Sequence, residues 1–186
     1  ESLWTCECDA KARASHVDAI PDTACKFTNI ENFISEKDLA AMRTLKTKAK
    51  RYEKWVKIAK GATYNNKAYC SHHLKMCQIR RPFMDASGSM CTSYSSLGKM
   101  DKDESENLIL LLSWLFWHIK NKTPLLIHEN VTGFLSNLVT EQGETNGYGH
   151  LQVKVRPSDV GMAVGRMRKH LSCLSLSAVQ RFYRLQ

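Results

Sequence analysis

The sequence has no hydrophobic run long enough to cross a membrane, and no secretory signal is visible in it. Its longest apolar run extends from Leu108 to Ile119 and is interrupted by Ser113. A membrane-spanning helix needs about 20 predominantly apolar residues. We therefore interpret this run as a buried helix and expect no membrane partner. Internal repeats and low-complexity linkers are also absent, and a length of 186 residues fits one domain with a hydrophobic core.

A disulfide framework is absent as well. The seven cysteines are odd in number and show no framework-like spacing: Cys6, Cys8, Cys25, Cys70, Cys77, Cys91 and Cys173. Free thiols in a reducing compartment are the expected state of such a chain. We therefore predict an intracellular protein, nuclear in a eukaryote and cytoplasmic otherwise.

Acidic residues are too few to balance the basic ones, with 18 Asp and Glu against 27 Lys and Arg and a formal net charge of +9. A surplus of this size favours a polyanionic partner, most often nucleic acid. The surplus is densest between Arg43 and Lys60, where Glu53 is the single acid. This stretch can contact DNA phosphates, with RNA as the alternative partner. A solvated basic helix without such a partner is the other interpretation.

Apolar periodicity predicts an alternation of strands and helices. Strands are expected at residues 2–6, 24–28, within 76–86, and at 124–128, 147–155 and 171–176, and residues 61–74 are expected to form a polar loop. Helices are expected after Asp9, which is a plausible N-cap, and over residues 36–60, 103–120 and 132–140. The strand–helix–strand opening predicts an α/β fold.

A cysteine lies in a loop of small residues directly after a predicted strand. The loop runs from Gly88 to Lys99 and contains Cys91. Reacting groups in open α/β sheets gather at the carboxyl ends of strands, and glycines allow close approach of a substrate. A thiol at this place is a candidate nucleophile. The alternative is an inert loop cysteine, which is the commoner case.

Two further segments carry candidate polar groups. The apolar residues 125–127 are followed by Glu129 and Asn130, which places an acid at the carboxyl edge of the sheet. As an alternative, Glu129 caps or begins the next helix. Arg166 and Arg168 occupy alternate positions of an extended segment, so they point the same way and can hold a phosphate or a base edge. A solvated basic pair is the alternative interpretation there.

Taken together, these segments resemble the motifs of the cytosine-C5 DNA methyltransferases. Residues 88–99, Gly-Ser-Met-Cys-Thr-Ser-Tyr-Ser-Ser-Leu-Gly-Lys, resemble that family's nucleophile loop, and residues 127–131 resemble its Glu-Asn-Val motif. The separation of Cys91 from Glu129 is typical of the family. The segment containing Arg166-x-Arg168 is similar to the later Arg-x-Arg motif, and residues 6–13 are similar to the acidic turn after the second strand.

The resemblance implies a Rossmann-like methyltransferase fold that uses S-adenosylmethionine, with a mostly parallel sheet flanked by helices. It implies a catalytic core over residues 1–176, a basic helical insertion at about 36–74, and a C-terminal tail at residues 177–186.

The resemblance also implies roles for individual residues. Cys91 is the implied nucleophile at C6 of cytosine, and Glu129 is the acid at N3. Arg166 and Arg168 are implied to steady the flipped base or the nucleophile loop. The implied cofactor-binding residues, with Glu7 at the ribose and Asn29 and Ile30 near the adenine, are Glu7, Cys8, Asn29, Ile30 and Gly88.

The chain departs from the family pattern at three positions. Met90 stands where the family has proline, Val164 where it has glutamine, and Asn29 where it has an acid. The family's Gly-rich first motif is expected before Glu7, and no target-recognition domain follows Leu174, so we expect a fragment of a longer protein or a decayed copy. Two alternatives to the DNA enzyme follow: an inactive methyltransferase-like module that binds nucleic acid, and an RNA cytosine-C5 methyltransferase.

Further histidines, cysteines and aromatic residues lie outside these motifs. Cys70, His72, His73 and Cys77 are metal-ligand residue types. Their spacing lacks the two tight pairs of a standard structural zinc site, so we predict no metal. The residues that we interpret as structural or core are His118, His128, Trp114, Phe116 and Trp117.

Overall fold

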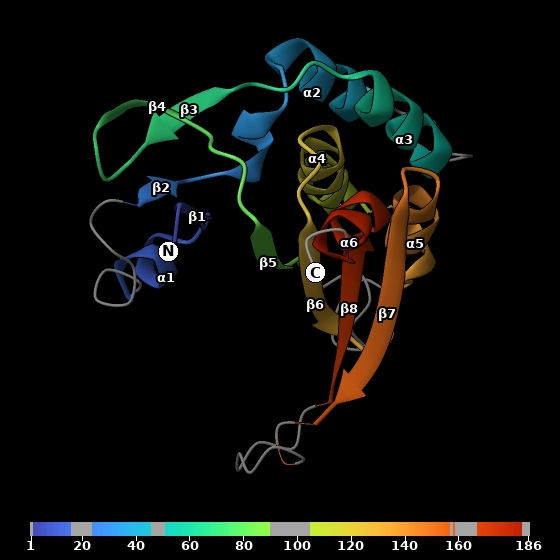
Figure 1. Ribbon diagram of the computed structural model, residues 1–186. Helices are drawn as coiled ribbons and strands as arrows, with labels where there is room; N and C mark the ends of the chain where they lie inside the picture. The colour runs from blue at the N-terminus through green and yellow to red at the C-terminus, as the bar shows by residue number, and fades with distance from the viewer. Residues whose placement is uncertain are drawn as a thin grey trace. The chain divides into compact units, whose positions relative to one another are not determined.

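The computed structural model describes residues 2–15, 24–45, 51–89, 105–156, 158 and 167–183. The chain forms two compact units (Figure 1). The first unit comprises Glu1–Pro82 and Ile109–Trp117, and the second comprises Phe83–Leu108 and His118–Gln186. None of the helices in the described ranges has the length and apolar character needed to span a membrane.

The first unit contains a four-stranded sheet with the strand order β1-β2-β3-β4. Its strands are β1 (Trp4–Cys6), β2 (Cys25–Phe27), β3 (Lys67–Cys70) and β4 (Lys75–Gln78). β1 and β2 are parallel, whereas β3 is antiparallel to both β2 and β4. β1 and β2 agree with the predicted strands. β3 lies in the segment predicted as a polar loop, because four residues are too few for their alternating burial to stand out in the sequence.

Local capping explains where the helices of the first unit begin. These helices are α1 (Ala10–Ser15), the 3-10 helix η1 (Ile30–Phe33), α2 (Glu36–Arg43) and α3 (Arg51–Gly61). Asp9 caps α1 as predicted, because its Oδ1 accepts the N–H groups of Lys11 and Ala12, each at 2.8 Å. Ser35 caps α2, since its Oγ accepts the Asp38 N–H at 3.2 Å.

The single helix predicted over residues 36–60 is wrong in its extent. α2 ends at Arg43 with Thr44 as its C-cap, α3 begins at Arg51, and residues 46–50 lie outside the described residues. The indole Nε1 of buried Trp55 donates to the Met42 carbonyl at 2.8 Å and so ties the end of α2 to α3. This hydrogen bond satisfies a carbonyl at the helix end, which helical periodicity alone does not reveal.

Aromatic rings form much of the core of the first unit. Phe27, Phe33 and Trp117 are almost completely buried. The centroid of the Phe33 ring lies 5.4 Å from those of Phe27, Trp4 and Trp117. Tilted and edge-to-face contacts of this kind add to the gain from hydrophobic burial. Trp114, Phe116 and Trp117 are buried, as predicted.

The second unit contains a four-stranded sheet with the order β5-β6-β8-β7. Its strands are β5 (Met84–Gly88), β6 (Leu125–Val131), β7 (Tyr148–Val155) and β8 (Arg168–Ser175). β5 and β6 are parallel, and β8 is antiparallel to both of its neighbours, β6 and β7. Helix α4 (Asn107–Lys120) contributes residues to both units, and the second unit also contains α5 (Asn137–Glu144) and α6 (Leu176–Tyr183).

The predicted α/β fold is present, but the mostly parallel sheet is not. Within the described residues, two of the six strand pairings are parallel, β1 with β2 and β5 with β6. The turn between β3 and β4 is too short for the crossover that a parallel pair requires. The strand expected within residues 76–86 is in fact two strands, β4 and β5, with Pro82 between them. Proline has no N–H to donate to a ladder.

Candidate active site and cysteine–histidine cluster

Strand β6 positions the predicted acidic residue, Glu129. His128 and Asn130 on either side of it are buried, and Glu129 lies on the alternate, partly exposed face. Its Oε1 accepts a hydrogen bond from Arg168 Nε at 2.5 Å. Arg168 begins β8 and pairs with Val131, which makes it a diagonal neighbour of Glu129. The structure thus brings together two of the predicted catalytic residues.

The parallel pairing of β5 with β6 sets the surroundings of this carboxylate. Gly88, the last residue of β5, lies opposite Glu129 in the register. A Cβ added at Gly88 would meet Glu129 Oε2 at 3.4 Å, so the glycine leaves space beside the carboxylate. Because the two strands run in the same direction, their carboxyl ends meet at one edge of the sheet.

Ser89 directly follows β5, and two buried side chains of β6 contact it. His128 Nε2 lies 3.0 Å from Ser89 Oγ. Asn130 Nδ2 donates to the same Oγ at 2.8 Å and to the Ser89 carbonyl at 3.3 Å. Cys91 and Arg166 lie outside the described residues. The sequence patterns did not identify Ser89, although the alternating polar residues of β6 are a signal that could have found its partners.

Burial keeps His128 neutral. The residue is 2% exposed, and desolvation lowers its pKa to about 4. Its ring centroid lies 5.0 Å from that of Phe134. A neutral imidazole offers one donor and one acceptor nitrogen, which suits a fixed contact with a hydroxyl group. His128 is therefore a buried structural histidine, as predicted.

The predicted ribose-binding residue, Glu7, lies directly after β1 in the first unit. Its N–H donates to the Phe27 carbonyl at 3.2 Å and so continues the ladder to β2. Its Oε1 accepts the Asp9 N–H at 2.8 Å. Arg13 Nη1 donates to the carbonyls of Glu7 at 2.6 Å and of Cys8 at 2.7 Å. These contacts hold the acidic turn at the carboxyl end of β1.

The other predicted cofactor-binding residues lie in both units. Asn29 and Ile30 follow β2, the parallel neighbour of β1, so they share one sheet edge with Glu7 and Cys8. Ile30 also packs against the core of the first unit. Gly88 belongs to the second unit.

The side chain of Asn29 caps η1. Its Oδ1 accepts the Glu31 N–H at 2.9 Å, and its Nδ2 donates to Glu31 Oε2 at 3.1 Å. The same carboxylate oxygen pairs with Arg43 at 2.6 Å. Glu31 is an acid that the sequence patterns did not single out, and its contacts give it a structural role at the end of β2.

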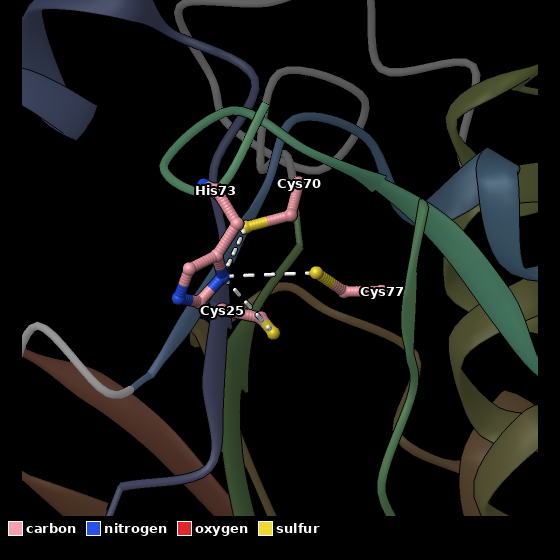
Figure 2. A group of neighbouring side chains, drawn as sticks. All are labelled: Cys25, Cys70, His73 and Cys77. Carbon is pink, nitrogen blue, oxygen red and sulfur yellow. Dashed lines mark hydrogen bonds between the residues drawn. The ribbon is translucent and has the colours of Figure 1, made fainter. Parts of the chain in front are cut away.

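Four metal-ligand side chains meet in the first unit (Figure 2). They are Cys25 of β2, Cys70 at the end of β3, His73 in the turn that follows, and Cys77 of β4. Nδ1 of His73 lies 3.8, 3.3 and 3.6 Å from the Sγ atoms of Cys25, Cys70 and Cys77, respectively. The sequence patterns did not associate Cys25 with the others, because it precedes His73 by 48 positions.

The thiols of this cluster differ in acidity. Burial raises the pKa of Cys25 to about 12, and the neighbouring Cys77 and Cys70 act in the same direction. Burial also acts to raise the pKa of Cys70, but backbone N–H donors outweigh it and lower that pKa. Two of these donors, the N–H groups of Lys26 and His73, lie 3.2 and 3.4 Å from Cys70 Sγ. Charge is therefore favoured at Cys70 over Cys25.

Helix α3 carries part of the basic face predicted to bind nucleic acid. Lys54, Lys57 and Lys60 are exposed, whereas Trp55 and Ala59 are buried. Residues three apart lie on the same side of a helix, so the three lysines form one exposed row. The remaining lysines of this stretch, which lie outside the described residues, are Lys46, Lys48 and Lys50.

Comparisons with known proteins support the fold. No protein-family model matches the sequence, and no curated protein matches it significantly. A candidate DNA modification methyltransferase encoded within an Escherichia coli prophage has a similar structure, with a TM-score of 0.58 at 13% sequence identity, over 96% of this chain and 41% of that one. A methyltransferase of Entamoeba histolytica matches with a TM-score of 0.37 at 17% identity, over 49% of this chain and 31% of its own. The chain thus shares an α/β fold with the prophage protein and spans about two-fifths of its length.

Proposed function

We propose that this chain carries the core of a DNA methyltransferase that transfers a methyl group from S-adenosylmethionine to C5 of cytosine. The observation that carries the proposal is the register of β5 and β6, which sets Gly88 beside Glu129. Cys91 follows Gly88 by three positions in the sequence, which supports its proposal as the nucleophile that acts with Glu129. The fold shared with the prophage methyltransferase supports the same class of reaction on DNA.

The chemistry of cytosine explains why these residue types are needed. C5 is a weak nucleophile, and addition of the Cys91 thiolate at C6 makes it enamine-like. Negative charge then develops on the ring, and the protonated Glu129 carboxyl offsets it by donating a hydrogen bond to N3. Once C5 carries the methyl group, a water molecule accepts the C5 proton, and elimination of the Cys91 thiolate restores the aromatic ring. The base must leave the duplex for this reaction.

Arg168 acts as a positioning residue in this proposal. Its Nε holds Glu129 Oε1 at 2.5 Å. Its Nη1 is buried and has no hydrogen-bond partner within the described part of the chain. The guanidinium group can therefore orient the carboxylate and still offer a donor to the base or to a phosphate. By resemblance alone, Arg166 is assigned to steady the flipped base or the nucleophile loop.

The residues at the ends of β1 and β2 fit the nucleoside part of S-adenosylmethionine. The Glu7 carboxylate is held by the Asp9 N–H at one oxygen, and carboxylates accept hydrogen bonds from ribose hydroxyls. Cys8 and Ile30 share this edge and would contact the adenine, next to the capping side chain of Asn29. Gly88 is assigned to the cofactor by resemblance. When bound, S-adenosylmethionine supplies the electrophilic methyl group.

Methyl transfer by the full-length gene product tests the proposal. The protein is incubated with duplex DNA and S-adenosylmethionine carrying a labelled methyl group, and the digested nucleosides are identified by mass spectrometry. We expect the label in 5-methylcytosine, no product with Cys91→Ser, and a rate lower by about 10²-fold or more with Glu129→Gln. Cys173→Ala, in the core of the second unit, is the matched control that retains activity. Label in adenine, or unchanged activity of Cys91→Ser, would refute the proposal.

A second candidate function is nucleic-acid binding without catalysis. The exposed row of Lys54, Lys57 and Lys60 on α3 favours it. A product that binds DNA and cofactor but transfers no methyl group would establish this function. The same assay with an RNA oligonucleotide tests the third function, an RNA cytosine-C5 methyltransferase.

A further inference from the structure

We propose that the first unit binds a structural zinc ion through Cys25, Cys70, His73 and Cys77. The proposal concerns this unit alone and does not rest on the proposed methyl transfer. Zinc accepts three thiolates and one imidazole as a complete ligand set. The four ligand atoms of this cluster all lie within 4.8 Å of one another (Figure 2).

The distances within the cluster fit a tetrahedral ion. Bonds of about 2.3 Å from zinc to sulfur and about 2.0 Å from zinc to nitrogen, at the tetrahedral angle, set the sulfur–nitrogen distance at about 3.5 Å. Nδ1 of His73 lies 3.3, 3.6 and 3.8 Å from the three sulfur atoms. An ion at the centre of the cluster therefore requires only small adjustments of the side chains.

The sheet of the first unit explains why the three thiols converge. Cys70 pairs with Lys75, so Cys77, two residues further along β4, is its diagonal neighbour on the same face. Phe27 pairs with Cys70, which makes Cys25 the corresponding neighbour on β2. Three adjacent strands therefore present one thiol each from one face, and the turn after β3 brings the His73 ring against them (Figure 2).

Backbone donors around Cys70 support a thiolate ligand. Its Sγ accepts the Lys26 N–H at 3.2 Å and the His73 N–H at 3.4 Å. Hydrogen bonds to ligating groups orient them and tune the metal, and they are a regular feature of metal sites. The turn is also tied to β2, because the N–H and Oγ of Ser71 both donate to the Lys26 carbonyl at 2.9 Å.

Backbone strain in the turn is a further sign of an imposed geometry. Leu74 has a φ of 52°, in the left-handed region that favours glycine. That conformation costs a residue with a side chain about 1 kcal/mol or more. Leu74 is 73% exposed, so its own burial offsets little of this cost. Strain of this kind persists where surrounding contacts over-determine the backbone, and a metal bound by His73 and Cys77, on either side of Leu74, would do so.

Simple packing of buried thiols is the competing explanation. Cys25 and Cys70 do belong to the hydrophobic core of the first unit, and free buried cysteines often act as small apolar residues. One imidazole nitrogen, however, makes one hydrogen bond and cannot satisfy three thiols at once. A metal ion satisfies all four groups. Because the protein would supply all four ligands, no open position remains for a substrate, and the site is structural.

Metal analysis of the full-length gene product, purified without a histidine tag, tests the proposal. Zinc is counted by plasma mass spectrometry after dialysis against metal-free buffer. We expect His73→Gln to lower the bound zinc by about one ion per chain. His72→Gln is the matched control, since this exposed neighbouring imidazole is not part of the cluster and its loss leaves the zinc content unchanged. Equal zinc contents in His73→Gln and the unmodified protein would overturn the proposal.

A second measurement keeps the proposal testable if His73→Gln fails to fold. Thiols of the unmodified protein are alkylated before and after addition of a chelator, and the labelled peptides are identified by mass spectrometry. We expect Cys25, Cys70 and Cys77 to become reactive only after chelation, whereas exposed Cys8 reacts in both conditions. Labelling of the three cysteines that does not depend on the chelator, or a disulfide between any two of them, would contradict the zinc site.

Discussion

Acidification is expected to destabilise the second unit through His128. The pKa of this buried histidine falls from 6.5 in the unfolded chain to about 4 in the folded protein. Between these values the unfolded chain takes up a proton that the folded protein does not, so stability falls as the pH drops from 6.5 towards 4. Each pKa unit corresponds to about 1.4 kcal/mol of free energy. Neutral His128 therefore contributes about 3 kcal/mol to the free energy of unfolding, and this contribution is fully present above pH 6.5.

Urea unfolding of the chain at pH 7 and pH 4 measures this contribution, with NMR signals of the second unit as the probe. His128→Gln removes the titrating group, and its amide can still reach Ser89 Oγ, which lies 3.0 Å from the imidazole in the native protein. We expect the unmodified protein to lose about 3 kcal/mol more than this variant between the two pH values. His150→Gln is the matched control, because His150 is partly exposed and pairs with Glu144 at the surface.

Two results would refute this reasoning. The first is an NMR titration in which the His128 ring protonates near pH 6.5 in the folded protein. The second is an equal loss of stability between pH 7 and pH 4 in His128→Gln and in the unmodified protein. In that case the carboxylates would account for the whole acid dependence. Either result would mean that water reaches the ring despite its 2% exposed surface.

Three other changes separate the roles of residues in the two units. Glu129→Gln should change the free energy of unfolding by less than about 1 kcal/mol, because water screens the partly exposed ion pair with Arg168. A large drop in the thermal melting temperature would instead assign Glu129 a structural role. Trp55→Phe removes the indole donor to the Met42 carbonyl, which then keeps only weaker backbone donors such as the Leu45 N–H at 3.4 Å. It should cost about 1 kcal/mol in urea unfolding, and unchanged stability would show that these donors or water replace the indole. The exposed lysines of α3 are Lys54, Lys57 and Lys60. Their replacement by Gln should reduce the steepness with which the logarithm of the DNA-binding constant falls against the logarithm of the salt concentration, by up to about 3. An unchanged slope would mean that DNA binds elsewhere.

Features decided by residues close in sequence could be predicted from the sequence. The apolar runs of β6 and α4 mark buried elements, and both are present. The Asp9 cap depends on donors two and three positions away. The placement of Glu129 on this strand follows in the same way, because the apolar run before it identifies the strand, but β6 continues past the expected end at residue 128 to Val131.

Features decided by contacts between distant segments could not be predicted. The pairing of β3 with β2 and β4 depends on strand partners that no local pattern specifies. Ser89 meets its partners on β6 across 39 and 41 positions. Cys25 meets His73 across 48 positions, so the spacing within residues 70–77 did not reveal the four-ligand cluster.

The attachment site of a cytosine analogue is the most direct test of the proposed function. The full-length gene product is incubated with S-adenosylmethionine and a duplex that contains 5-fluorocytosine. Fluorine at C5 cannot leave as a proton does, so the methylated base stays bound to the attacking thiol, and mass spectrometry of the digested protein locates it. The proposal predicts a linked peptide that contains Cys91, and no linked peptide with Cys91→Ser. An adduct at Cys70 or Cys77, or none in a product that binds both DNA and cofactor, would contradict it.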